Sequence, residues 1–406
     1  MKRKTSLLII FLSVFIDLIG FGIVLPLLPG YTEHFGAKGF LIGVIIASFS
    51  AMQFLFAPVW GQLSDRIGRR PVMLISNAGA AGSYALFAIA SGMTGSTALW
   101  GIVASRVFAG ICGANLSVAS AYIADISPPD KRSAGMGLIG MAFGLGFIFG
   151  PALGAFSADA FGRQGPGWVA ASLCAANFIL GWFILGESKN PDSQPATARP
   201  KFAQWTHTLS QPRLGLLIGI FFLATFCFTC FESTFPLLVK HGFNSQEKDH
   251  RVGYLFTYAG VIAAVVQGGL IGRLVKRFGE QRLIFISLLI VAVSLALLPF
   301  QLHMAGLLLS LGLFAIGSGI NRPPVFGLIS LNSPANEQGA NLGVAQSIGS
   351  LARIIGPIFA TTLFAVKPTL PYLICGGVAL VAAILTWYRL CKTSQPVVAG
   401  KPQSVG

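Results

Sequence analysis

The stretch Gly61-Gln62-Leu63-Ser64-Asp65-Arg66-Ile67-Gly68-Arg69-Arg70-Pro71 is a compact, strongly charged sequence between two long apolar runs. The chain has 406 residues, of which 54% are hydrophobic and only 10% are charged, so this cluster is expected to lie in water as a loop. A degraded copy, Gly272-Arg273-Leu274-Val275-Lys276-Arg277-Phe278-Gly279-Glu280-Gln281-Arg282, begins 211 residues after Gly61. A repeat of this length predicts that one half of the protein was built twice.

The composition excludes a soluble globular protein, in which charged residues make up roughly 25% of the chain. The mean hydropathy is +0.74, and the sequence contains 49 glycines and 33 phenylalanines. We therefore predict an integral membrane protein. Neither a nucleotide-binding P-loop, nor a metal cluster, nor a nucleophile–base pair is visible in the apolar runs, so no cofactor, no metal and no enzyme activity are expected. The CxxC at Cys227 and Cys230 lies within an apolar run and is interpreted as packing.

A helix that crosses a membrane needs about 20 apolar residues. By that criterion the sequence predicts twelve spans, at 6–30, 41–62, 72–92, 98–123, 133–158, 166–186, 213–238, 252–272, 282–301, 304–329, 340–365 and 370–390. The expected fold class is an all-α integral membrane protein with twelve transmembrane helices in two six-helix, pseudo-symmetric halves. The halves are residues 1–187 and 213–392; residues 188–212 form a polar, non-periodic cytoplasmic linker, and residues 393–406 a disordered cytoplasmic tail.

Lysine and arginine are distributed unequally between the segments that separate these spans. With a cytoplasmic N-terminus, 19 of the 28 basic residues fall on the inner side and 6 on the outer side, and the other three lie within spans. Because basic residues accumulate on the cytoplasmic side, both termini are predicted to be cytoplasmic. The same asymmetry explains the formal charge of +15 without a nucleic-acid partner. We expect a multi-pass protein of the plasma membrane, the bacterial inner membrane.

The two halves also match outside the charged stretch. Gly150-Pro151 corresponds to Gly356-Pro357, and Gly113-Ala114-Asn115 corresponds to Gly319-Ile320-Asn321. Two parallel repeats place a substrate path at their interface, near the middle of the bilayer. This is the architecture of a transporter, and it makes Asn115 and Asn321 candidate site residues.

These motifs resemble the major facilitator superfamily over nearly the whole chain. Gly61–Pro71 is similar to the family's loop 2–3 motif, Arg106–Gly110 to its span 4 motif, and Gly146–Gly154 to the span 5 motif of its antiporters. Asp17–Gly22 and Ala121–Asp125 resemble the tetracycline-efflux branch of the twelve-span drug:H+ antiporters. The resemblance implies a monomer that exchanges protons for a small molecule by alternating access.

The sequence departs from the tetracycline pumps at three places. Ser83 stands before Tyr84 where those pumps carry an acid, span 9 has only apolar and serine positions where they carry another acid, and no histidine occurs near Ala263 in span 8. These departures argue against tetracycline itself as the substrate.

Five charged residues fall within predicted spans: Asp17, Arg106, Glu232, Arg322 and Arg353. A charge at the centre of a bilayer costs at least about 2.5–3.5 kcal/mol on insertion scales, so such residues are functional candidates by default. Asp17 lies close to the expected midplane and Glu232 about six residues from the outer end of span 7. Both are candidates for proton coupling or substrate contact. The alternative for Asp17 is a permanent structural partner of an arginine or of a helix N-terminus. The alternative for Glu232 is an acid that reaches the membrane interface or pairs with an arginine.

The three arginines are interpreted differently. The resemblance implies that Arg106 adjusts the proton affinity of a neighbouring acid, and the alternative is a hydrogen-bond hub. Arg322 precedes Pro323-Pro324, which must interrupt helical bonding, and Arg353 lies in the middle of span 11. Arg322 and Arg353 are interpreted as buried structural partners. Three intramembrane arginines against two intramembrane acids nevertheless favour an anionic or zwitterionic substrate.

Two further groups are implied by the resemblance. Gly61 would let spans 2 and 11 approach closely, Asp65 would cap the N-terminus of span 11, and Arg69 would pair with Asp125, so that together they close the cytoplasmic face as a gate. The alternative, compatible role of the basic residues here is to set topology.

The second group is the span 5 antiporter motif, in which Gly146, Gly150, Pro151 and Gly154 would permit close helix contact and seal the protein against proton leak.

The sequence thus predicts a proton-coupled secondary transporter whose partners are a small-molecule substrate, protons and the lipid bilayer. We expect an antiporter that exports small amphipathic compounds. The alternative is an importer or exchanger of an organic anion or metabolite on the same fold, and a third possibility is a receptor that has lost transport.

Overall fold

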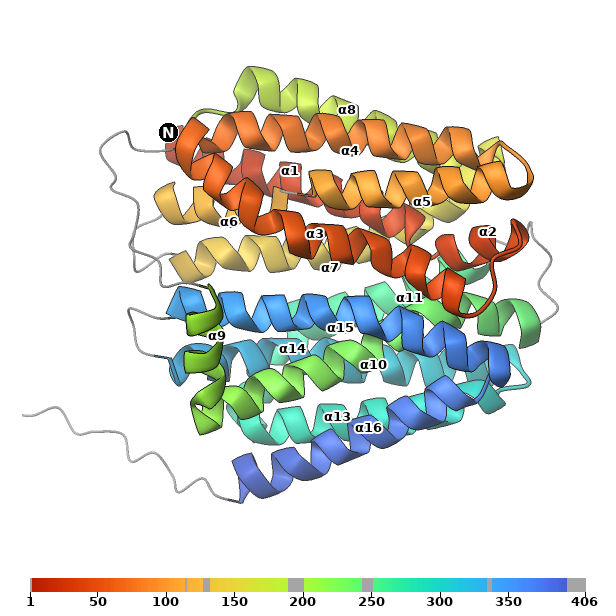
Figure 1. Cartoon of the computed structure of the whole chain (residues 1–406). Helices are drawn as coiled ribbons and strands as arrows, with labels where there is room; N and C mark the ends of the chain where they lie inside the picture. Colours follow the sequence, from red (N-terminus) through yellow and green to blue (C-terminus); the bar gives the residue numbers. More distant parts are fainter. Residues whose placement is uncertain are drawn as a thin grey trace, which may run out of the picture.

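The computed structural model describes residues 2–113, 115–126, 132–188, 201–242, 251–333 and 338–392, and every regular element in them is helical. The helices lie side by side as one elongated bundle (Figure 1). The α-helices are α1 (Lys2–Val24), α2 (Leu28–His34), α3 (Phe40–Ile67), α4 (Arg69–Ser91), α5 (Gly95–Cys112), α6 (Asn115–Ile126), α7 (Arg132–Phe161), α8 (Gly165–Ile184), α9 (Lys201–Ser210), α10 (Pro212–Gly242), α11 (Arg251–Val265), α12 (Ile271–Phe278), α13 (Glu280–Leu297), α14 (Met304–Leu331), α15 (Gln338–Val366) and α16 (Leu370–Thr386). Three short segments join or extend them: the π-helical η2 (Val266–Leu270) and η4 (Trp387–Cys391) and the 3-10 turn η3 (Leu298–Phe300).

By length and composition, eleven helical segments of the described chain can cross a membrane. They account for eleven of the twelve expected spans. The span expected at 252–272 is different, because α11 is only 15 residues long and continues through η2 into the amphipathic α12. The sequence Val266-Gln267-Gly268-Gly269-Leu270 explains the interruption, since two adjacent glycines weaken regular α-helical bonding.

The sequence predicts a loop at Gly61–Pro71, but this charged stretch is almost entirely helical. Gly61–Ile67 belongs to α3, and α4 starts at Arg69. Only Gly68 interrupts the helix, with a φ of +106° that favours glycine. In the second copy α12 ends before Gly279, whose φ is +75°, and α13 starts at once. The two left-handed glycines are 211 residues apart, the same offset as the sequence repeat.

The span expected at 98–123 is not continuous. α5 ends at Cys112, Gly113 is not helical, and α6 begins at Asn115. Backbone groups freed inside a membrane need partners from the protein. Side chains of α3 and α4 supply them: Trp60 Nε1 donates to the Ile111 carbonyl (2.5 Å), Ser76 Oγ to the Cys112 carbonyl (2.5 Å) and Gln53 Nε2 to the Gly113 carbonyl (3.4 Å).

The segment between the two repeats contains a helix that sequence analysis did not predict. Within the expected linker 188–212, α9 crosses the end of the bundle (Figure 1), with Trp205 edge-on to Phe54 of α3 at 6.3 Å between ring centroids. Thr208 Oγ1 donates to Asn341 Oδ1 of α15 at 2.7 Å. The expected tail, residues 393–406, lies outside the described residues.

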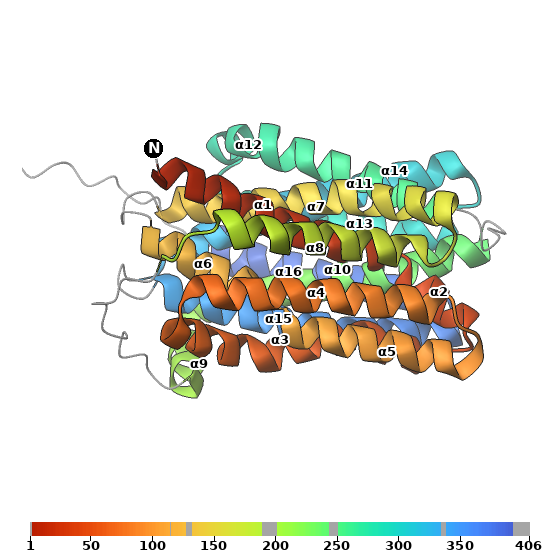
Figure 2. The same ribbon diagram turned by 90° about the horizontal axis from the view of Figure 1, so that it is seen from above.

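The two ends of the bundle differ. The end that carries both ends of the described chain is called the terminal face below, and the end that carries α2 is called the α2 face (Figures 1 and 2). One apolar core joins residues of both repeats near α2, such as Leu28 and Ile42 with Phe235 and Phe364. Toward the terminal face the core divides into separate clusters. One is formed by residues 9–185 of the first repeat, and two lie in the second repeat, a large one within residues 214–390 and a small one of Val266, Leu283 and Ile320.

Two helix seams join the repeats. In the first, Gly260 of α11 lies so close to α7 that an added Cβ would stand 2.8 Å from the Phe147 carbonyl oxygen. In the second, an added Cβ on Gly43 of α3 would stand 2.5 Å from the Cα of Ile358 on α15. Contacts this short between backbones require glycine, as at small-residue interfaces of other membrane helices.

Candidate functional site

Asp17 lies in the middle of α1 at the edge of a small polar cavity of about 30 Å³. The polar lining groups are Asp17, Gln53 of α3, Ser83 and Tyr84 of α4, and Gly113 at the break after α5. Two phenylalanines, Phe21 and Phe49, close another side with their ring centroids 5.2 Å apart. The carboxylate is therefore held inside the apolar bundle next to neutral polar groups.

Arg106 of α5 is 3% exposed and lies behind this cavity. Its guanidinium carbon is 5.4 Å from the ring centroid of Tyr84 and 5.3 Å from that of Phe87. Within the described residues, its Nε and Nη2 atoms have no hydrogen-bond partner. Tyr84 interacts electrostatically with both Arg106 and Asp17, so the arginine faces the acid across an aromatic side chain.

Tyr84 reaches α1 because Gly20 leaves room for it. An added Cβ on Gly20 would stand 2.9 Å from the tyrosine ring.

In the second repeat, three helices bring Glu232 of α10, Arg322 of α14 and Arg353 of α15 together. Arg353 interacts electrostatically with both Glu232 and Arg322. The Oε1 atom of Glu232 is buried without a hydrogen-bond partner among the described residues. Arg322 also stacks on Phe326, 5.5 Å from its ring centroid. Arginine thus outnumbers acid in this group, as the sequence predicts for the spans as a whole.

The two asparagines of the repeated Gly-x-Asn motif are separate from these groups. Asn321 is 5% exposed, and its Nδ2 donates to Ser287 Oγ of α13 at 2.9 Å. That bond joins two helices and occupies the amide. Asn115 begins α6, but its side chain lies outside what the structure describes.

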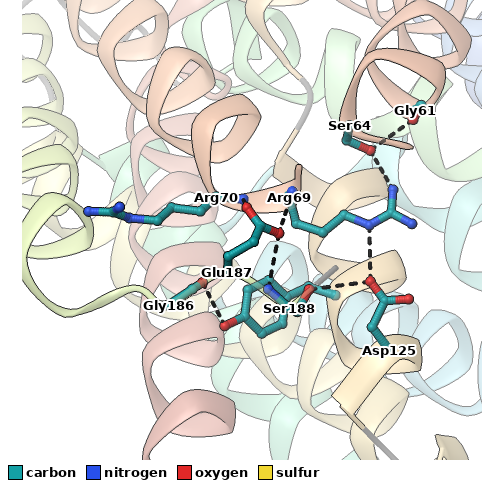
Figure 3. Close-up of polar contacts among 9 residues, drawn as sticks. Gly61, Ser64, Arg69, Arg70, Asp125, Gly186, Glu187 and Ser188 are labelled. Carbon is teal, nitrogen blue, oxygen red and sulfur yellow. Dashed lines mark hydrogen bonds and ion pairs between the residues drawn. The ribbon is translucent and has the colours of Figure 1, made fainter. Parts of the chain in front are cut away.

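The terminal face carries a polar cluster around the start of α4 (Figure 3). Arg69 Nε pairs with Asp125 Oδ2 of α6 at 3.1 Å, and Arg69 Nη1 donates to Ser64 Oγ at 2.6 Å. Glu187 lies across the helix start: its Oε1 accepts the Arg69 N–H at 2.8 Å and its Oε2 accepts the Arg70 N–H at 3.1 Å. A carboxylate here satisfies orphan amides and complements the helix dipole.

The cluster contains the expected Arg69–Asp125 pair, and the gate itself stays a prediction. The Arg69–Asp125 pair joins two helices of the same repeat, α4 and α6, so by itself it cannot hold the two repeats together. An added Cβ on Gly61 would meet nothing within 4 Å, so Gly61 does not bring α3 and α15 together here. The close approach occurs instead at Gly43, nearer the α2 face, because the apolar core is divided at the terminal face. The side chain of Asp65 lies outside the described part of the structure.

The glycines of the antiporter motif pack α7 against α1. Added Cβ atoms on Gly146, Gly150 and Gly154 would each stand 2.7–2.8 Å from atoms of α1. The matching position on α1 is Gly22, whose Cα is 2.7 Å from the Cβ site of Gly150. On its other side α7 contacts α11, where the Pro151 carbonyl lies 2.9 Å from the Cβ site of Gly253. α7 is therefore held between its own repeat and the other one.

An ionic contact between the repeats, which sequence analysis missed, lies at the α2 face. Lys240 Nζ of α10 is 2.7 Å from Glu33 Oε2 of α2, and His241 Nε2 is 3.1 Å from Glu33 Oε1. We call these three residues the outer clasp. Nearby, within the first repeat, Tyr31 donates to the Arg163 carbonyl at 3.2 Å.

Sequence analysis also missed Gln53 and Glu187. Gln53 could have been noticed as the only amide or charged residue between Phe40 and Trp60, and Glu187 as an acid at the end of a span. Glu33 is harder to recognise from the sequence, because it stands among polar residues beyond Pro29, where a charged residue is common. Its partners on α10 are more than 200 residues away, and no local pattern connects them.

Curated proteins similar to this chain are membrane transporters. Tetracycline resistance protein, class C, of Escherichia coli is 31% identical over 372 residues, covering 90% of this chain and 91% of that protein. Major facilitator superfamily domain-containing protein 10 of Bos taurus is 30% identical over 407 residues, covering 88% and 86%. Among solved structures, the human organic anion transporter MFSD10 (TETRAN) has a TM-score of 0.71 at 27% identity, over 95% of this chain and 99% of that one.

A D-xylose-proton symporter has a TM-score of 0.77 at 18% identity, covering 95% and 98% of the two chains, and indicates the fold alone. The model of the Major Facilitator Superfamily matches residues 10–357 and 250–404. The predicted family, with tetracycline resistance proteins among its similar members, is therefore confirmed, and the homologues are transporters rather than enzymes. The chain belongs to the major facilitator superfamily of membrane transporters.

Proposed function

We propose that this transporter is a proton-coupled antiporter that exports small amphipathic compounds by alternating access. The observation that carries the proposal is Asp17, a carboxylate at a polar cavity within the long apolar part of α1. Ionisable groups at this depth are rare, and in pumps and transporters they form proton relays. Similarity to tetracycline resistance proteins supports export as the direction.

In this proposal the chain spans the membrane twelve times as two six-helix halves. The twelfth span is α11 continued by η2 and α12, which run without a gap from residue 251 to residue 278. The terminal face is cytoplasmic and the α2 face is external, because lysine and arginine accumulate on the former. The membrane is the bacterial inner membrane, and the working unit is a monomer.

The core and the outer clasp correspond to one state of the transport cycle. The repeats share one apolar core and an ionic contact at the α2 face, but their cores are separate at the terminal face. This arrangement suits a conformation closed to the outside. Opening outward would require the clasp to break and the repeats to rock about the two glycine seams.

A second candidate, supported by one specific observation, is exchange of an organic anion. Arg322 and Arg353 lie together beside a single acid, Glu232, so the local charge favours an anionic ligand. The similar human protein MFSD10 is described as an organic anion transporter. An anion bound at the two arginines would weaken the electrostatic interaction of Arg353 with Glu232, which gives a direct way to couple substrate to a proton.

Inside-out membrane vesicles with an acidified lumen test both candidates. The lumenal pH is followed with a dye while tetracycline, ethidium or carboxyfluorescein is added outside. Antiport predicts proton release in the wild type with at least one compound, and its loss in Asp17→Asn or Glu232→Gln. Glu280→Gln, an acid at the start of α13, is the matched control and should retain the response.

Proton release with carboxyfluorescein alone would favour the organic-anion candidate. Uptake of an anion without any proton movement would contradict antiport with protons.

A further inference from the structure

The cavity beside Asp17 is large enough to hold a water molecule. Its volume of about 30 Å³ exceeds the roughly 10–15 Å³ that a water site needs. A buried water also needs two to four polar partners. The cavity offers Asp17, Gln53, Ser83 and Tyr84 from three helices.

The hydrogen bonds of Gln53 and Ser83 show what each of these two side chains can offer to a water. Gln53 Nε2 donates to the Gly113 carbonyl at 3.4 Å, and its Oε1 is an acceptor. The Ser83 hydroxyl donates to the Ala80 carbonyl at 2.8 Å, so toward the cavity it can only accept. A water here can therefore donate to the ionised Asp17 carboxylate with one hydrogen and to Gln53 Oε1 or Ser83 Oγ with the other.

Gln53 also holds the interruption between α5 and α6. Beyond that break, α6 extends for 12 residues to the terminal face. There Asp125 pairs with Arg69, and the Tyr122 hydroxyl donates to the Gly186 carbonyl at 2.9 Å. One end of α6 therefore adjoins the Asp17 cavity and the other end belongs to the polar cluster of the terminal face.

We propose that the cavity holds one water molecule that links the Asp17 carboxyl to Gln53, and that Gln53 is the positioning residue through which protonation of Asp17 moves α6. This proposal rests on the proposed function in taking Asp17 as the group that binds the transported proton. It adds a hydration site, a positioning residue and a moving segment to that function.

The protonation step adds one proton to a carboxylate oxygen and breaks no other bond. The new O–H of Asp17 then donates to the water, so the water must turn and direct both of its hydrogens at Gln53 Oε1 and Ser83 Oγ. The Gln53 amide moves with the turning water to which its Oε1 is bonded, and this displacement stretches the bond of its Nε2 to the Gly113 carbonyl, which is already long. Release of that bond frees the start of α6 to move.

The other titratable groups that act on Asp17 lie on neighbouring helices. Tyr84 of α4 and Cys174 of α8 both interact electrostatically with it, and Arg106 of α5 faces it across Tyr84. Gln53 of α3, in contrast, is neutral at every pH. A pH response that disappears on substitution of Gln53 therefore reports transmission from Asp17 rather than titration of the substituted residue.

Hydrogen–deuterium exchange of residues 115–126 tests the proposal in the purified, full-length protein. Rates are measured at acidic and alkaline pH and corrected for intrinsic exchange. The wild type should exchange about fivefold faster in acid, the effect of losing one hydrogen bond of typical net strength. Asp17→Asn should show the fast rate at both pH values, and Gln53→Leu should show no pH dependence. Gln267→Leu, an exposed glutamine on η2, is the matched control and should respond as the wild type does.

Infrared difference spectra between acid and alkaline samples detect the water itself. In H₂¹⁸O one water O–H stretching band should shift, and this band should be absent from Gln53→Leu and from Ser83→Val, which replaces a lining hydroxyl with a methyl group. Ser83→Val also keeps the proposal testable should Gln53→Leu fail to fold.

Three results would overturn the proposal: an unchanged pH response of α6 in Gln53→Leu, a water band that persists in both variants, or a response that requires Na⁺ and is lost in choline. The last would assign the cavity to a cation. Vesicles separate this failure from failure of the proposed function. Proton release that depends on Asp17, together with pH-independent exchange of α6, leaves antiport intact and removes only the hydrated link.

Discussion

Removal of the Glu33 charge should open the α2 face. In the outer clasp one carboxylate of α2 contacts two groups of α10, the Lys240 ammonium at 2.7 Å and the His241 ring at 3.1 Å. Glu33→Gln leaves the shape of the side chain nearly unchanged and removes its charge. Because this is an ionic contact between the repeats at the α2 face, its loss should favour the outward-open state.

The magnitude follows from the burial of the pair. The side chains of Glu33 and Lys240 are 24% and 33% exposed, between a surface pair and a buried pair. Surface pairs contribute about 0.2–1 kcal/mol, whereas breaking a buried pair costs about 3–5 kcal/mol. We expect about 1.5–2 kcal/mol here, which shifts the ratio of open to closed molecules by roughly 10- to 30-fold. High salt should reduce the effect, since both groups are partly solvated.

Spin labels at Met93 and Leu302 would report the opening, because these exposed positions belong to different repeats. Their distance distribution should gain a longer component in Glu33→Gln. The charge-swapped pair Glu33→Lys with Lys240→Glu is the control, and it should restore the closed distribution because the contact re-forms with opposite signs. The double-mutant cycle isolates the coupling between the two side chains.

An unchanged distance distribution in Glu33→Gln would refute the clasp as a gate, and so would a charge swap that opens the protein further than either single substitution. The first result would assign closure of this face to the shared apolar core alone.

Three other substitutions test particular contacts. Gly150→Val should force α7 away from Gly22 at a cost of about 1–3 kcal/mol of stability. The thermal midpoint should fall, and an imposed proton gradient should decay faster in proteoliposomes. An unchanged decay rate would contradict a sealing role for this glycine. Glu187→Gln should weaken the start of α4 by about 0.3–1 kcal/mol, which unfolding in denaturing detergent would measure, and the loss should shrink at high salt if charge is the cause. Arg106→Lys keeps the charge but loses the flat guanidinium that stacks on Tyr84. It should cost about 0.5–2 kcal/mol of stability and shift the pH profile of transport. A loss of stability with an unchanged pH profile would mean that Arg106 contributes to packing only.

The membrane fold could be predicted because its signals are long and redundant. Eleven predicted spans correspond to helical segments of sufficient length, since an apolar run of about 20 residues has few other solutions. The repeat was visible in the glycines and charges, and Gly68 and Gly279 occupy equivalent left-handed positions. The prediction that the charged stretches are loops was wrong. Arg66 and Lys276 lie on helices, because a helix end that extends beyond the bundle can carry charged residues without unwinding.

The broken spans could not be predicted from hydropathy alone. Residues 98–123 form a continuous apolar pattern, and the break at Gly113 is stabilised by Trp60, Ser76 and Gln53 from other helices. These partners are brought to the break only by tertiary packing, which a hydropathy pattern does not show. The same holds for the two aromatic rings beside the Arg106 guanidinium, those of Tyr84 and Phe87, which belong to another helix.

Under the proposed function, the size of the cavity beside Asp17 places proton and substrate in different halves. Pockets for drug-sized molecules occupy about 300–1,000 Å³, roughly ten times or more the cavity beside Asp17, so no amphipathic compound fits there with the acid. Arg322 and Arg353 instead supply the charge that a substrate would meet. Coupling between such sites must be mechanical. The helix placed to provide it is α7. Its glycines contact α1, which carries Asp17, and its other side contacts Gly253 and Gly260 of α11 in the other repeat. A shift of α1 on protonation of Asp17 would then be transmitted through α7 to α11 without any contact between proton and substrate.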